Sequence, residues 1–242
     1  MFIAILEFLK IYLLPFIFGM VPLTIWLFFF LLRDWKHPEP RKVVFLAFIM
    51  GILSSFIVLV IQNYIEYFAK IKIPNLYEAL RYHDTFKDFL FVAFLEEITK
   101  FSVIYFTFRK SKYLDEAIDP MIYMIVCAIG FSSIENYFSI FQQWTTLSIP
   151  IQTLIARFLG ANLLHIICSG VIGFFWSMQI FTKKYKLLFI GIILAVLFHT
   201  IFNTLIFTYG IFAILLMFIC VFIGASILLW LFDVVEKLNL KI

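Results

Sequence analysis

The sequence predicts an all-α protein, a polytopic bundle of transmembrane helices, on three observations. Hydrophobic residues make up 64% of the 242 residues and include 33 Phe. Charged residues make up only 14%, against about a quarter in a soluble domain. The apolar residues fall into stretches of about 20, the length that a helix needs to cross a bilayer. We therefore expect a single transmembrane domain over residues 1–242, with the lipid bilayer as its surroundings.

Seven stretches are predicted to span the membrane. They cover residues 12–32, 43–62, 86–108, 118–141, 150–181, 186–208 and 211–232. The fifth is longer than a bilayer requires, so it is tilted or extends beyond it. An eighth short span within residues 1–15 is an alternative that Glu7 and Lys10 disfavour. Between the second and third spans, residues 63–85 form the longest connection, which is either a solvated loop or in part an interfacial amphipathic helix.

The loops predict the orientation of the bundle. Lys and Arg are concentrated at 33–42, 109–112, 183–186 and 237–241, which all lie on one side. Because cytoplasmic loops carry the excess of basic residues, the N-terminus is expected outside, the C-terminus inside and the 63–85 connection outside. The net charge of +4 thus reports topology, and we expect no nucleic-acid partner.

Four of the spans carry polar residues that a lipid-facing helix should lack. They are Glu96, Glu97 and Lys100 in the third, Glu135 and Asn136 in the fourth, His165 and Ser169 in the fifth, and His199 and Asn203 in the sixth. A charge at the bilayer centre costs about 2.5–3.5 kcal/mol, so such residues face a bundle interior and mark functional sites. Counted at about 1.5 Å per residue, five levels lie between the midplane and the outer third: those of the Glu96–Glu97 pair, Glu135, His165, His199 and Asn203. This agreement predicts one site.

The spacing of these residues suggests acid–base chemistry. Lys100 can pair with Glu97 (i,i+3) or Glu96 (i,i+4) but not fully with both, which leaves one carboxylate as a candidate general base. His199 and Asn203 share a helix face and can donate hydrogen bonds to an oxyanion. Glu135 has no partner in its own helix, and Arg157 is a candidate counter-ion. The non-catalytic alternatives are an internal ion pair and interhelical hydrogen bonds.

These motifs occur in the order EExxK, FxxxEN, HxxxS and HxxxN, after a short loop that contains Pro38-Glu39-Pro40. In this order the chain resembles the PrsW family of intramembrane proteases, which is related to the type II CAAX prenyl endopeptidases and the CPBP proteases. The resemblance implies that Glu96 and Glu97 are the essential glutamate pair and that His199 and Asn203 form the oxyanion hole. It implies that Glu135 takes the place of a histidine of the CAAX relatives, and that His165 is a further site histidine.

The resemblance also implies a substrate. It is a single-span membrane protein such as an anti-sigma factor, cut first near its extracytoplasmic side in regulated intramembrane proteolysis. In the mechanism that we expect, Glu96, assisted by Glu97 or Glu135, activates a water. His199 and Asn203 then stabilise the oxyanion, and His165 positions the water or protonates the leaving amine. Lys100 balances the charge of the glutamates, and Asn136 and Ser169 have supporting positions.

Three alternatives stay open at this point. No cofactor or metal is expected, since the sequence has no HExxH motif, but Zn²⁺ bound by Glu97, Glu135, His165 and His199 is the alternative. A proton-coupled transporter would also place carboxylates and histidines at mid-membrane, although no inverted repeat is evident. A non-catalytic membrane scaffold is the remaining alternative.

Overall fold

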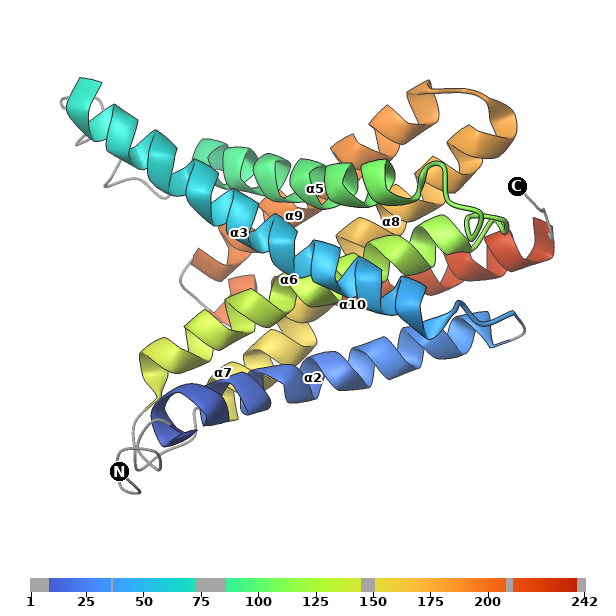
Figure 1. The fold of residues 1–242 in the computed structure, drawn as a ribbon. Helices are drawn as coiled ribbons and strands as arrows, with labels where there is room; N and C mark the ends of the chain where they lie inside the picture. The colour runs from blue at the N-terminus through green and yellow to red at the C-terminus, as the bar shows by residue number, and fades with distance from the viewer. Residues whose placement is uncertain (1–8, 36, 73–85, 145–150, 208–210, 239–242) are drawn as a thin grey trace.

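The computed structural model describes residues 9–35, 37–72, 86–144, 151–207 and 211–238. Within these ranges the chain is helical, without a strand, and forms one bundle (Figure 1). In chain order the elements are η1 (Leu9–Leu13), α2 (Leu14–Leu31), η2 (Leu32–Asp34), α3 (Arg41–Lys72), α5 (Phe86–Phe108), α6 (Asp119–Gln143), α7 (Ile151–Ala156), η3 (Arg157–Ala161), α8 (Asn162–Thr182), α9 (Lys186–Phe207) and α10 (Ile211–Leu238). The predicted all-α polytopic bundle is confirmed.

Each predicted span has a helical counterpart in the described ranges. Six helical stretches are long and apolar enough to cross a membrane. The helix that corresponds to the third predicted span, α5, falls outside this group because Glu96, Glu97 and Lys100 interrupt its apolar sequence. The fifth predicted span is one long helical stretch, in which the π-helical turn η3 joins α7 to α8.

The connection predicted over residues 63–85 begins later than expected. Helix α3 does not end at residue 62 but continues to Lys72, so residues 63–72 extend the second span. The reason is local, because no Gly or Pro occurs between Gly51 and Pro74 to break the helix. The rest of the connection, and most of the alternative short span at residues 1–15, lie outside the described residues.

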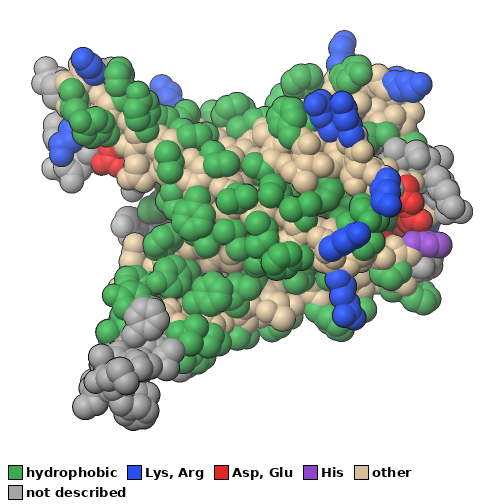
Figure 2. Space-filling view, in the orientation of Figure 1, with side chains coloured by type: hydrophobic (Ala, Val, Ile, Leu, Met, Phe, Trp, Pro, Cys, Tyr) green, Lys and Arg blue, Asp and Glu red, His purple; other side chains and the backbone are tan. Residues whose placement is uncertain are grey.

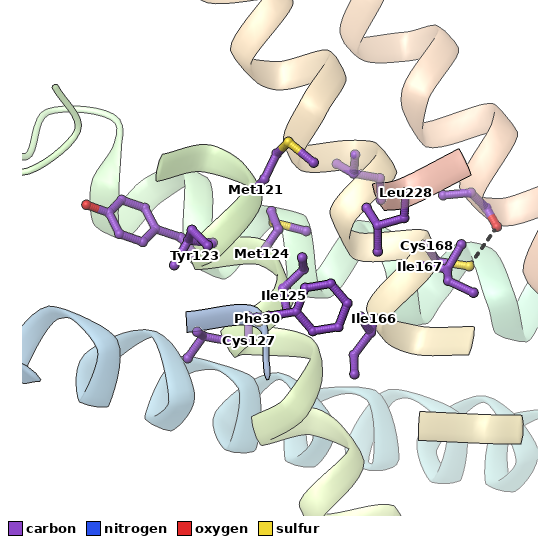
Figure 3. Close-up of a cluster of buried hydrophobic side chains, with 14 of the residues drawn as sticks. Phe30, Met121, Tyr123, Met124, Ile125, Cys127, Ile166, Ile167, Cys168 and Leu228 are labelled. Atoms are coloured by element: carbon purple, nitrogen blue, oxygen red, sulfur yellow. Dashed lines mark hydrogen bonds between the residues drawn. The ribbon is translucent and has the colours of Figure 1, made fainter. Parts of the chain in front are cut away.

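Helices α6 and α8 form the centre of the bundle. Their apolar residues interlock with those of α2 and α10, as Figure 3 shows for Phe30, Met121, Ile166 and Leu228, all of which are buried. The outer helices leave large apolar side chains exposed, including Phe212 of α10. Figure 2 shows this apolar covering, with Lys and Arg gathered mainly at one end of the molecule. The centre of the bundle therefore shields the polar groups that lie there from lipid.

Helices α3 and α6 approach each other closely where they cross. A Cβ atom on Gly130 would lie 2.1 Å from the Phe48 carbonyl oxygen, and one on Gly51 would lie 2.0 Å from the Cys127 carbonyl oxygen. Small residues at a helix crossing permit such contact between backbones. Because Phe131 and Glu135 follow Gly130 on α6, this crossing determines how α3 and α6 flank the polar residues.

Substitution of Gly130 by Ala should destabilise the bundle, because α3 would have to move away from α6. We expect a loss of about 1–3 kcal/mol, the usual cost of overpacking, visible as a lower Tm in detergent micelles. Gly19→Ala is the matched control, because its Cβ would meet its nearest neighbours at 3.4 Å, an ordinary contact. Equal Tm values for the two variants would contradict the role of the crossing.

Candidate active site

The polar residues of α5, α6, α8 and α9 converge in the centre of the bundle. Helix α5 supplies Glu96, Glu97 and Lys100, and α8 and α9 supply His165 and His199. All five residues are at most 7% exposed. The two imidazole rings lie 5.0 Å apart between centroids and meet edge to face. The sequence could predict a common depth for these residues, and the structure shows in addition that they face one another.

Lys100 is the central hydrogen-bond donor of the cluster. Its ammonium nitrogen donates to Glu97 Oε1 at 2.6 Å and lies 3.1 Å from His165 Nδ1. It also lies 4.8 Å from the centre of the Phe131 ring, a cation–π contact. Since an ammonium group has no lone pair, His165 Nδ1 must accept this hydrogen bond. The predicted i,i+3 pair of Lys100 is thus formed, and it selects Glu97 rather than Glu96.

Glu97 takes a second hydrogen bond from His199. His199 Nδ1 lies 2.9 Å from Glu97 Oε1 and must donate, because an ionised carboxylate only accepts. This leaves His199 Nε2 with a lone pair, and it lies 3.7 Å from Glu96 Oε2. Glu96 Oε2 is buried without a hydrogen-bond partner among the described residues. These two acceptor atoms, together with Glu97 Oε2, which is also buried without a partner among the described residues, are the chemically unsatisfied part of the cluster.

Glu135 connects His165 to a further cation. Its Oε2 atom lies 3.0 Å from His165 Nε2 and 2.8 Å from Arg157 Nη2. Arg157, which stands at the start of η3, is thus the counter-ion that the sequence suggested. Arg157 also donates to Asn136 Oδ1 and to Ser139 Oγ. Glu135 is therefore occupied by two donors, whereas Glu96 is not.

A cavity of about 530 Å³ reaches this cluster from one end of the bundle. Its lining includes Glu96, Glu135, His165, His199 and Asn203, and it extends to residues in the last turns of α6 and α9, Gln142 and Ile206. These turns are at the opposite end of their helices from the basic loops around Lys112 and Lys186. On the predicted orientation, the cavity opens toward the extracytoplasmic side.

The other predicted site residues lie behind the cavity wall. Glu97 and Lys100 are fully buried and reach the cavity only through the two histidines. Asn136 is buried and donates to the Gly19 carbonyl oxygen of α2 at 2.9 Å. Ser169 is buried, and among the described residues it is absent from the cavity lining and its Oγ atom has no partner. The catalytic roles assigned to all these residues stay predictions.

Three polar residues that line the cavity were not predicted as site residues from the sequence. Ser139 and Gln142 line the cavity, and Arg157 lines it as well as pairing with Glu135. Ser139 and Gln142 follow Glu135 at helical spacing on one face of α6, a signal that was available. Arg157 was recognised only as a counter-ion.

Of the three groups of described side chains that could hold a metal ion, two lie in this cluster. Ligand atoms of Glu96, His165 and His199 lie within 4.8 Å of one another, as do those of Glu97, Cys168 and His199. In the first group, His199 offers its Nε2 lone pair and Glu96 an unpartnered oxygen. His165, by contrast, has both ring nitrogens engaged, by Lys100 and Glu135. The first group therefore has two ready ligands and a third that must exchange a partner.

Comparison with known proteins points to one family. A family model described as PrsW family intramembrane metalloprotease matches residues 39–229. Proteins named Protease PrsW are similar to this chain: that of Geobacillus kaustophilus (strain HTA426) is 28% identical over 69% of this chain and 67% of the relative. That of Clostridioides difficile (strain 630) is 25% identical over 78% and 77%, and that of Bacillus subtilis (strain 168) is 27% identical over 49% and 50%. No solved structure matches.

Removal of the Lys100 ammonium should destabilise the protein strongly. Lys100→Met would leave the Glu97 carboxylate buried without its cation, which costs about 3–5 kcal/mol in comparable pairs. The double variant Lys100→Met/Glu97→Gln restores neutrality and should recover much of this loss. Thermal unfolding in detergent micelles measures both.

Arg33→Met is a matched control, because the Arg33–Asp233 ion pair at 3.2 Å is partly exposed and should contribute at most about 1 kcal/mol. A Lys100→Met variant as stable as Arg33→Met would contradict the central role of the ammonium group.

Proposed function

Because this chain belongs to the PrsW family of intramembrane proteases, we propose that it hydrolyses a peptide bond of a membrane-anchored protein near the extracytoplasmic side of the membrane. The chain is a multi-pass integral protein of the cell membrane, and the bilayer is its environment. We further propose a single-span protein such as an anti-sigma factor as the substrate, with this cut as the first of regulated intramembrane proteolysis. The observation that carries the proposal is a pair of acceptors on two residues that line a cavity: Glu96 Oε2, which has no hydrogen-bond partner among the described residues, and His199 Nε2, 3.7 Å from it.

The cavity supports a substrate that arrives from the membrane. A smaller cavity between α3 and α6 shares Leu59, Glu96 and Glu135 with the main one and adds Gln62 and Ile134. Glu96 is thus approached both from the end of the bundle and from between two helices. A segment that unwinds between α3 and α6 would bring its peptide bond to Glu96 without crossing the buried core.

The proposed reaction begins with a water held by Glu96 Oε2 and His199 Nε2. Glu96 takes one proton from this water, and the water oxygen forms a bond to the carbonyl carbon of the scissile peptide. The carbonyl becomes an oxyanion, to which the Asn203 amide can donate. When the C–N bond breaks, the proton on Glu96 passes to the leaving amine, which regenerates the carboxylate.

The hydrogen bonds support different roles for the two histidines. In its neutral form His199 presents a lone pair at Nε2, so it first orients the water and can donate to the oxyanion only when it carries a second proton. His165 has both nitrogens engaged, by Lys100 and Glu135, so we assign it to positioning rather than to protonation of the amine. Glu135, which two donors already occupy, is a weaker candidate for the base than Glu96.

Glu96→Gln and His199→Ala should abolish cleavage without loss of the protein from the membrane. A misplaced or missing acid–base group costs about 10²–10⁴-fold in rate. Membrane proteomes of cells that carry the wild type or Glu96→Gln should differ by an uncut single-span protein that accumulates only with the variant. Normal processing of that protein by both variants, at equal membrane abundance, would exclude the protease mechanism proposed here.

A zinc-dependent form of the same hydrolysis is the second candidate. It is favoured by the hydrogen bond from His199 Nδ1 to Glu97, because metal-ligating histidines often donate their other ring N–H to a carboxylate. Glu96 and His199 would hold the ion, with His165 as third ligand after a change of partner. Zinc would supply Lewis-acid activation of the water and the carbonyl. Against it, the Lys100 ammonium beside His165 repels a second cation.

Metal analysis distinguishes the two candidates. If Glu96 acts without metal, protein purified in detergent should contain no stoichiometric zinc, and cleavage of the accumulating single-span protein should persist after dialysis against a chelator. About one zinc per chain, together with activity that a chelator removes and zinc restores, would instead support the metal-dependent form. The Glu96→Gln variant serves as the inactive reference in both measurements.

A further inference from the structure

Arg157 occupies an unusual position at the edge of the site. It is the first residue of η3, a five-residue π-helical turn between α7 and α8. Such turns interrupt α-helices mostly at functional sites, because the extra residue re-aims the side chains next to it. The Arg157 side chain is 16% exposed and lines the same cavity as Glu96 and His199. Its guanidinium therefore lies within the site. Among the described residues, it makes no hydrogen bond or ion pair with Glu96.

The acceptors of the guanidinium among the described residues all belong to one helix, α6. The Arg157 Nε, Nη1 and Nη2 atoms donate to Asn136 Oδ1, Ser139 Oγ and Glu135 Oε2, respectively. The fixed fork of an Arg side chain makes this set of bonds geometrically specific. Asn136 in turn donates to the Gly19 carbonyl oxygen, which anchors it to α2. The position of the positive charge beside Glu135 is thus determined by η3, which carries Arg157, by α6, and by α2 through Asn136.

The same Glu135 oxygen receives Arg157 and His165. Glu135 Oε2 lies 2.8 Å from Arg157 Nη2 and 3.0 Å from His165 Nε2. Because His165 Nδ1 accepts from Lys100, the single proton of the neutral ring is on Nε2 and points at Glu135. Arg157 and His165 thus both hold the same carboxylate oxygen of Glu135. Without Arg157, Glu135 would lose the fork that fixes its position against His165 Nε2.

We propose that Arg157 is a positioning residue for the hydrolysis: its fork holds the Glu135 carboxylate against His165 Nε2 and thereby holds the His165 ring in place beside His199. The proposal rests on the proposed function, whose base is Glu96. In this arrangement Glu135 orients His165 and does not activate water. The two site histidines hold opposite neutral forms, Nε2–H in His165 and Nδ1–H in His199, and each form is set by a charged neighbour.

Charge-balance variants test this proposal with the single-span protein that accumulates in Glu96→Gln cells as the probe. Arg157→Met should lower the cleavage rate about 10²-fold, the usual cost of a misplaced catalytic group. Arg157→Met/Glu135→Gln should be faster than Arg157→Met, because the uncompensated carboxylate is gone. Arg157→Lys, which keeps the charge but loses the fork, should be intermediate. Arg33→Met, at the exposed pair with Asp233, should match the wild type.

The form of His165 is a second readout that does not depend on cleavage. The chain has four His, so nitrogen-15 NMR of histidine-labelled protein in detergent micelles can be assigned with His165→Asn and His199→Asn. The wild type should show one buried ring protonated at Nε2 and one at Nδ1. The His165 signal should change in Arg157→Met and be retained in Arg157→Lys.

The outcomes separate this inference from the proposed function. An unchanged His165 signal in Arg157→Met overturns the positioning role, whether cleavage is kept or lost. Cleavage by Arg157→Met at the wild-type rate overturns it as well. If the wild type cleaves no single-span protein, the proposed function fails, and the NMR comparison alone still decides whether Arg157 fixes His165. If Arg157→Met does not fold, Glu135→Gln provides the comparison with the wild type, and a His165 signal unaltered in Glu135→Gln contradicts the proposal.

Discussion

A fully buried ammonium group at the centre of a lipid-embedded bundle constrains every polar neighbour. Lys100 has no exposed surface, so its charge must be matched and its protons accepted within the protein. Glu97 provides the charge and His165 Nδ1 accepts a further hydrogen bond. Because an ammonium only donates, this contact decides where the proton of His165 resides, and Glu97, once ionised, decides the same for His199. One cation thus determines the hydrogen-bond directions of both rings.

The network divides the ionisable groups into satisfied and open ones. Glu97 and Glu135 each accept two donors on one oxygen, while Glu96 lines the cavity and its buried Oε2 atom has no hydrogen-bond partner among the described residues. A carboxylate that is already bound by two cations or imidazoles is a poor proton acceptor, since protonation would break those bonds. The chemical difference between adjacent Glu96 and Glu97 therefore follows from their directions on α5, about 100° apart, and not from their residue type.

Much of the architecture could be predicted from the sequence, because apolar length and helical spacing are local properties. The seven spans, the Lys100–Glu97 spacing and the shared face of His199 and Asn203 are of this kind. The rotation of each helix about its axis is not local, so the sequence could not tell that Ser169 is absent from the cavity lining. It also could not tell that Arg157 stands on a π-helical turn and binds three residues of α6. The continuation of α3 to Lys72 was readable from the missing Gly and Pro, but apolar windows alone ended the span too early.

The crossing of α3 and α6 explains why the site is closed on one side and open on the other. The two backbones are in contact at Gly51 and Gly130, which leaves no room for water or substrate at that level. Beyond the crossing the helices diverge, as Figure 1 shows, and Leu59 and Phe138 line the space between them. Glu96 borders this space just past the point of closest contact. The crossing thus sets the depth at which a substrate can meet the open carboxylate of Glu96. The α3–α6 pair closes one half of the bundle and leaves the other half open to water and substrate.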